Sequence, residues 1–161
     1  MLFRSQKKFV ELSYTRIYSS LFETYCLLND LTSVIECGRK LLHFVRGCGD
    51  KTRESQVTRI MAALCYHQGK YKVAINLYKE ALRIMIEKGN KEGQSTCYEN
   101  LGTVYLTLGE YEKAKTYQEN ALVITKEIGD KRGEARCYLN LGTVYKSLGE
   151  YEKAKIGRAH V

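Results

Sequence analysis

Proline and tryptophan are absent from the 161 residues of this chain, and methionine, histidine and phenylalanine are scarce. Without proline, nothing in the sequence forces a kink or an early end on a helix. No apolar run approaches the roughly 18 residues that a membrane-spanning helix needs, so no such helix is expected. The six cysteines include no C-x-x-C pair, which predicts small apolar thiols in a reducing compartment.

What the chain does have is an internal repeat with a period of 40 residues. Residues 137–155 match residues 97–115 at sixteen of nineteen positions without a gap. A further shift of one period keeps the skeleton of the pattern, with Gly69, Tyr71 and Ala74 opposite Gly109, Tyr111 and Ala114. The unit before that is divergent. Because a single unit cannot bury its apolar face alone, such a period predicts stacked structural units.

Each unit is expected to hold two helices. In the third unit one apolar stripe at helical spacing consists of Tyr98, Leu101, Gly102, Tyr105 and Leu108. A second stripe consists of Tyr111, Ala114, Tyr117, Ala121, Leu122, Ile124 and Ile128. Glycine followed by Asp or Asn recurs at 49–50, 89–90 and 129–130, where it predicts a left-handed helix end followed by an N-cap. The predicted fold is all-α, a right-handed superhelical solenoid of antiparallel helix pairs.

The period divides the chain into a divergent first unit at 6–48, units at 49–88 and 89–128, and a truncated unit at 129–155. Residues 156–161 abandon the repeat and resemble the translation of a common sequencing adapter, and Leu2 to Ser5 resemble its reverse complement. We therefore expect residues 1–5 and 156–161 to be adapter-derived and the natural chain to be longer at both ends. Without Arg4 and Arg158, the remaining 24 basic and 18 acidic residues leave a net charge of +6.

No set of side chains in the sequence favours catalysis. Carboxylates such as Glu110 and Glu150 recur with the repeat, whereas an active site is normally built once. The glycines form no phosphate-binding loop. His43 and His67 have no partners at metal-ligand spacing, so neither a metal site nor a cofactor is expected. The chain is predicted not to be an enzyme.

Binding is better supported, because stacked helix pairs curve and present the first helix of each unit on a concave surface. Polar side chains opposite the buried stripe are the candidate groove residues: Arg59 in the second unit, Glu99, Asn100 and Thr103 in the third, and Arg136, Asn140 and Thr143 in the fourth. An amide both donates and accepts, so Asn100 and Asn140 could bracket successive peptide groups of an extended ligand. The alternative is that both amides are merely solvated. Arg59 and Arg136 would favour an acidic ligand, with simple exposure as the rival explanation.

The motifs N-L-G-x-x-Y, L-G-x-Y-x-x-A and A-L resemble those of the tetratricopeptide repeat family over about residues 14–155. Tyr98 and Tyr138 stand where that family often has tryptophan. The long period, the missing proline and the G-D-K joint look like the long-repeat branch, found in G-protein-signalling modulators of the LGN/Pins type and in tetratricopeptide repeat protein 28-like proteins.

In LGN-like relatives, asparagines at the positions that match Asn100 and Asn140 help to hold partner peptides, and the resemblance implies that role here. Ser20 and Ile60 interrupt this ladder in the first two units. Members that clamp a C-terminal carboxylate use an asparagine where this chain has Thr103 and its copy in the next unit. That activity is therefore not expected.

These patterns together predict a non-catalytic, cytoplasmic scaffold that binds a partner peptide or helix in the concave groove, in signalling or in cell-division and polarity complexes. The second hypothesis is a regulatory array of a larger enzyme, an NTPase or a peptidase. Nucleic acid is disfavoured because the basic residues alternate with glutamates, as they do over residues 110–113. The expected partner is a protein or peptide, with neither nucleic acid nor a membrane involved.

Overall fold

A computed structural model describes residues 2–27 and 31–149, and every element in those two ranges is an α-helix. The helices are α1 Leu2–Leu27, α2 Leu31–Cys48, α3 Lys51–His67, α4 Tyr71–Glu87, α5 Lys91–Thr107, α6 Tyr111–Ile128 and α7 Lys131–Ser147. The all-α expectation is confirmed. Helix α1 includes residues 2–5, while the end of the fourth unit and the other adapter-like segment, 156–161, lie outside the described residues.

Glycine and its following polar residue set the joint between successive units. Gly49, Gly89 and Gly129 all have φ between 66° and 73°, in the left-handed region where a glycine has no Cβ penalty. The next side chain then caps the following helix: Asn90 Oδ1 accepts from the Gly93 amide at 2.9 Å, and Asp130 Oδ1 accepts from the Gly133 amide at 3.0 Å. The predicted helix ends and N-caps are therefore confirmed at these joints.

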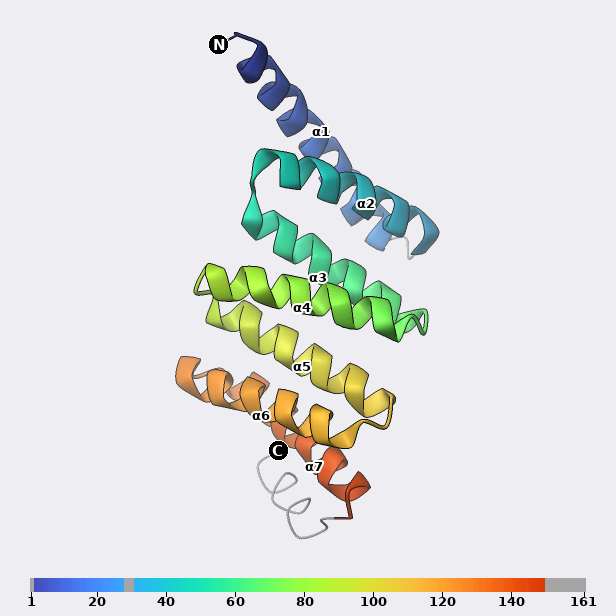
Figure 1. Cartoon of the computed structure of the whole chain (residues 1–161), viewed down its shortest axis with the longest axis vertical. Helices are drawn as coiled ribbons and strands as arrows, with labels where there is room; N and C mark the ends of the chain where they lie inside the picture. The colour runs from blue at the N-terminus through green and yellow to red at the C-terminus, as the bar shows by residue number, and fades with distance from the viewer. Residues whose placement is uncertain (1, 28–30, 150–161) are drawn as a thin grey trace.

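The helices stack as antiparallel pairs in two layers, with the odd-numbered helices in one layer and the even-numbered helices in the other (Figure 1). In the described part of the chain, the backbone of α5 approaches those of both α3 and α7, whereas no Cα atom of α4 lies within 8 Å of one in α6. Units that approach closely in one layer and separate in the other must curve. Helices α3, α5 and α7 therefore form the inner, concave side of the array.

The core lies between the layers, where α5 and α6 contribute a stripe of fully buried side chains. Leu101 and Cys97 are completely buried, and so are the small residues Ala114 and Ala121. Two residues of the predicted stripes are not part of it, because Leu108 is 40% exposed and Ile128 is 39% exposed. Both stand at the end of a helix, where no further turn of the neighbouring helix covers them.

A buried glutamine takes a position in this core that the apolar pattern did not reveal. Gln118 is 1% exposed, and its Nε2 donates to the Glu99 carbonyl oxygen on α5 at 3.0 Å. Its amide packs directly on Gly102, where an added Cβ would lie 2.5 Å from Gln118 Nε2. The close approach that the mid-helix glycine predicted is therefore confirmed at this position.

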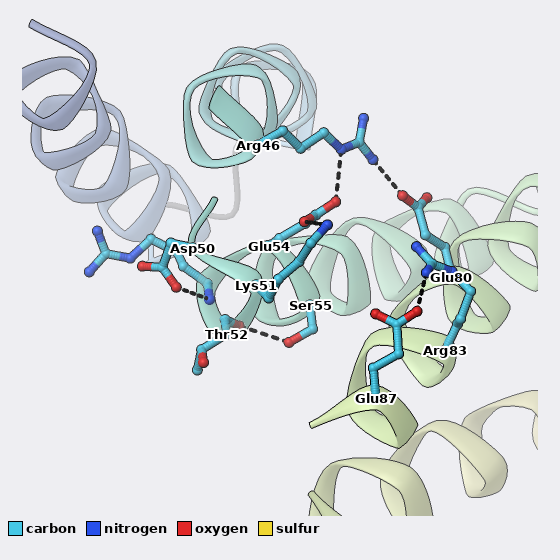
Figure 2. Close-up of polar contacts among 10 residues, drawn as sticks. Arg46, Asp50, Lys51, Thr52, Glu54, Ser55, Glu80, Arg83 and Glu87 are labelled. Carbon is cyan, nitrogen blue, oxygen red and sulfur yellow. Dashed lines mark hydrogen bonds and ion pairs between the residues drawn. The ribbon is translucent and has the colours of Figure 1, made fainter. Parts of the chain in front are cut away.

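A cluster of ion pairs joins α2, α3 and α4 (Figure 2). Glu54 is buried at the start of α3 and accepts from Arg46 Nε at 3.0 Å and from Lys51 Nζ at 2.8 Å. The same arginine reaches Glu80 on α4 at 2.6 Å. Because Arg46 bridges two carboxylates on consecutive helices, this Glu54 cluster fixes how the first unit sits on the second.

The Glu54 cluster predicts a loss of stability in acid. Burial raises the pKa of the Glu54 carboxyl, but its hydrogen bonds to Lys51 and Arg46 outweigh this, so the pKa lies below its ordinary value. A lowered folded-state pKa gives stability that is present above the unfolded pKa, about 4.3, and is lost as the pH falls through the folded value. We expect Glu54→Gln to cost about 1–2 kcal/mol at pH 7 and to lose less stability than the wild type between pH 5 and 3.

Urea unfolding at several pH values measures this difference. The substitution is sterically conservative, because the next unit has Gln94 at the matching position. Glu36→Gln, which removes an exposed i,i+4 pair with Lys40, serves as the control and should change little. Parallel pH profiles for the wild type and Glu54→Gln would contradict the assignment.

Candidate functional site

The predicted groove residues all project from the odd-numbered helices. Arg59 lies on α3, Glu99, Asn100 and Thr103 on α5, and Arg136, Asn140 and Thr143 on α7. Because α5 contacts both α3 and α7, the structure brings these residues onto one continuous layer. The layer is the concave side of the array, which is where the repeat pattern predicted a binding surface.

Asn100 and Asn140 occupy the same place on consecutive helices of this layer. Both side chains are partly exposed, and neither amide forms a hydrogen bond with any residue that the structure describes. An amide held on a rigid helix and not used internally can donate and accept at once. The geometry therefore leaves both groups available to a ligand.

Glu99 and Arg136 pair with each other, so neither is a charge without a partner in the groove. Glu99 is only 8% exposed, and Arg136 grips it with two hydrogen bonds, Nε to Oε2 at 2.9 Å and Nη2 to Oε1 at 3.2 Å. This hydrogen bonding raises the pKa of the Arg136 guanidinium despite its partial burial. The pair links α5 to α7, and each charge largely neutralises the other, while the Arg136 side chain stays 55% exposed.

The two threonines of the site present acceptors to the groove. Thr103 Oγ1 donates to the Glu99 carbonyl at 3.0 Å and Thr143 Oγ1 donates to the Leu139 carbonyl at 3.2 Å, each within its own helix. With the proton engaged, each hydroxyl retains oxygen lone pairs for a donor on a ligand. A peptide N–H is such a donor.

Arg59 remains as a groove cation without a carboxylate partner among the described residues. It is partly buried beside the core, where its charge opposes the effect of burial that raises the pKa of Tyr78 to about 12. The same positive charge lies near Cys97, whose pKa burial raises to about 11. Arg59 therefore makes the α3 end of the groove positive.

A contact between α3 and α5 in this layer was missed at the level of sequence. The Tyr66 hydroxyl on α3 lies 3.0 Å from the Thr107 hydroxyl on α5 and ties the two helices together. Leu139 on α7 is 55% exposed, although it stands beside Asn140 on the inner helices. The Glu99–Arg136 pair did have a signal in the sequence. Its 37-residue spacing is three less than the period, which places the two residues one helical turn out of register on adjacent helices.

Membrane spans, metal ligands and cysteines are three further features of the described residues. No helix in the described ranges is long and apolar enough to cross a bilayer. Residues 2–27 and 31–149 hold no group of three potential metal ligands. The cysteines whose side chains are described are free thiols, and burial raises the pKa of Cys137 to about 12.

Comparison with protein families gives one assignment, because the tetratricopeptide repeat profile matches residues 53–122 and 100–156. The chain belongs to the tetratricopeptide repeat family. The two matches overlap and together span more than half of the sequence, from α3 to beyond α7. Comparison with curated proteins gives no match.

Solved tetratricopeptide arrays have the same fold. BtubC from P. vanneervenii superposes with a TM-score of 0.82 at 24% identity, over 89% of this chain and 59% of its own length. The Rap protein complexed with competence and sporulation factor superposes with a TM-score of 0.77 at 19% identity. The match covers 91% of this chain and 41% of the Rap protein. A third structure is the signal transduction ATPase with a tetratricopeptide repeat sensor from Pyrococcus horikoshii. It superposes with a TM-score of 0.79 at 24% identity, over 89% of this chain and 23% of the ATPase. This chain thus spans less than two thirds of each of these proteins, and the likeness shows the tetratricopeptide fold alone.

Proposed function

We propose that this chain is a non-catalytic scaffold that binds an extended segment of a partner protein in the concave groove of α3, α5 and α7. The observation that carries the proposal is the pair of uncommitted amides, Asn100 and Asn140, on adjacent inner helices. Side-chain amides at a fixed repeat can each receive one peptide group, and hydrogen bonds to the main chain give affinity without a strict sequence requirement.

The groove also suggests what the bound segment contains. Arg59 favours an acidic side chain at the α3 end. Arg136 adds little to that preference, because Glu99 already neutralises it. Near α7 the exposed Leu139 offers an apolar contact instead. We therefore expect a segment with an acidic residue at one end and an apolar residue at the other.

The affinity of peptides selected on the wild-type chain from a random library tests the proposal. Asn100→Ala combined with Asn140→Ala removes both amides from the inner layer and should weaken binding by at least about tenfold, the loss of one or two hydrogen bonds. The matched control, Asn76→Ala with Asn120→Ala, removes two exposed asparagines from α4 and α6 and should leave binding unchanged. Equal affinities for the wild type and the inner-layer variant would refute the role of the two amides.

Several findings support this proposal without deciding the partner. One Rap protein of the same fold is solved in complex with competence and sporulation factor, and another in complex with the Phr* peptide. The 40-residue period supports a place in the long-repeat branch, with roles in signalling or in cell-division and polarity complexes. Free, buried cysteines suit the reducing cytoplasm. Several basic residues pair with glutamates, as Lys91 does with Glu127, which favours a protein partner over nucleic acid.

A second candidate function is that of a regulatory array attached to a larger enzyme. It is favoured by the likeness to the Pyrococcus horikoshii protein, in which a tetratricopeptide repeat sensor belongs to an ATPase. The full-length transcript distinguishes the two: a catalytic domain in the same reading frame supports the regulatory array, and further repeats alone support the scaffold.

A further inference from the structure

A second hollow opens on the other side of the array from the groove, between the even-numbered helices α4 and α6. Its volume is about 520 Å³, within the roughly 300–1,000 Å³ typical of small-ligand sites. It exists because α4 and α6 diverge on the convex side and leave part of α5 uncovered between them. Its lining includes Lys79, Leu82, Tyr98, Tyr105, Lys113 and Tyr117.

Three tyrosine rings form the wall of this hollow. Tyr105 and Tyr117 stack with centroids 5.2 Å apart and planes 11° from parallel, and Tyr98 lies 6.1 Å from Tyr117. Together with Leu82 they offer a flat apolar surface, on which a ligand ring can pack. The hydroxyls of Tyr105 and Tyr117 interact with each other, and the hydroxyl of Tyr98 adds a further O–H donor.

Two lysines supply positive charge around the rings. Lys113 Nζ lies 5.4 Å from the centroid of Tyr105, and Glu110 on the surface partly balances its charge. Lys79 forms no ion pair with the residues that the structure describes. Its charge opposes the burial that raises the pKa of the Tyr117 hydroxyl, so the ammonium group acts directly on the tyrosine cluster. Thr116 and Asn120 complete the rim.

The matching position one unit further along carries a carboxylate that this hollow lacks. One period after Lys79 stands Glu119, and one period after Tyr105 stands Tyr145. There the Tyr145 hydroxyl donates to Glu119 Oε1 at 3.2 Å, so the protein provides its own anion. Between α4 and α6, Lys79 stands where the next unit has Glu119. The tyrosine cluster therefore receives no carboxylate acceptor from that position.

We propose that this hollow binds a phosphate monoester carried on an aromatic ring, as the phosphorylated tyrosine side chain of a partner presents it. The ring packs on the tyrosines and Leu82, while the phosphate oxygens accept from Lys79 and from the tyrosine hydroxyls. A phosphate suits the site because its three oxygens can serve several donors at once. The site is separate from the groove, whose candidate residues lie on the inner faces of α3, α5 and α7.

Phenyl phosphate is the probe, titrated into the ¹⁵N-labelled chain and followed by amide NMR shifts. It should perturb amides near Tyr98, Tyr105 and Tyr117 and bind more tightly than either inorganic phosphate or phenol, which carry only the charge or only the ring. Binding no tighter than that of inorganic phosphate, or shifts away from the hollow, would overturn the proposal.

Charge-reversal variants sharpen this result. Lys79→Glu installs the side chain found at the matching position of the next unit and should weaken phenyl phosphate binding by at least about tenfold. Lys88→Glu makes the same charge change at the end of α4, where the lysine contacts Thr52 of α3, and should bind like the wild type. The combined Asn100→Ala and Asn140→Ala variant should also retain phenyl phosphate binding, so failure of the groove and failure of the hollow are told apart. Unchanged binding by Lys79→Glu, with a wild-type circular dichroism spectrum, would contradict the role of the lysine.

Discussion

Replacing Leu101 by alanine is expected to lower the free energy of unfolding by about 3–4 kcal/mol, the cost of a buried leucine plus the cavity it leaves. Leu101 is fully buried in a core that includes Tyr78 of α4, Cys97 of α5 and Ala114 of α6. The side chain therefore joins the second unit to the third. Since a repeat array is held together by contacts between neighbouring units, the loss should also separate the unfolding of the two halves.

Leu139→Ala is the matched control for this prediction. The same substitution is made one unit further along on an odd-numbered helix, but at a side chain that is 55% exposed, so it should cost less than about 0.5 kcal/mol. Urea unfolding followed by circular dichroism measures both variants. Similar losses in the two variants would show that the core does not run through Leu101 as described.

Gly102→Leu should destabilise the fold by about 3 kcal/mol, combining overpacking with a broken buried hydrogen bond. On its own, replacing a mid-helix glycine should stabilise α5 by up to about 1 kcal/mol. Here the new Cβ would lie 2.5 Å from Gln118 Nε2, which donates to the Glu99 carbonyl and has no space to move, being 1% exposed. Steric displacement therefore outweighs the gain in helix propensity.

A double-mutant cycle with Gln118→Ala tests this explanation. Shortening residue 118 leaves the space that the larger side chain at position 102 would need. The free energy of unfolding of the double variant should therefore exceed the value expected from adding the two single changes by at least about 1 kcal/mol. Thermal and urea unfolding of the four proteins give the coupling energy. Strict additivity would mean that Gly102 is required for some reason other than its contact with Gln118.

Local rules made much of the fold predictable from sequence. Gly89 and Asn90 define a joint by backbone conformation and side-chain reach alone, and both behave as the pattern predicts. The ends of the apolar stripes were less predictable, because the burial of Leu108 depends on whether a neighbouring helix extends over it. Gln118 was hidden for a related reason: a polar residue can be buried wherever a backbone carbonyl such as that of Glu99 faces it.

The candidate site was also predictable only where local sequence rules decide the outcome. Helical periodicity sufficed to place Asn100 and Asn140 on one face, because that depends only on the period. It did not show that Arg136 would close on Glu99, since that pairing depends on how α7 lies against α5 in space. The hollow between α4 and α6 depends on the curvature of the array and was likewise beyond the sequence pattern.

The most direct test of the account is to map a selected peptide onto the ¹⁵N-labelled chain by amide NMR shifts. The account predicts perturbations along the inner layer, around Asn100 and Thr103 on α5 and around Asn140 on α7, with the side-chain amide signals of both asparagines among the most affected. Perturbations confined to α4 and α6, with both asparagine amides unchanged, would contradict the claim that the concave groove holds the partner.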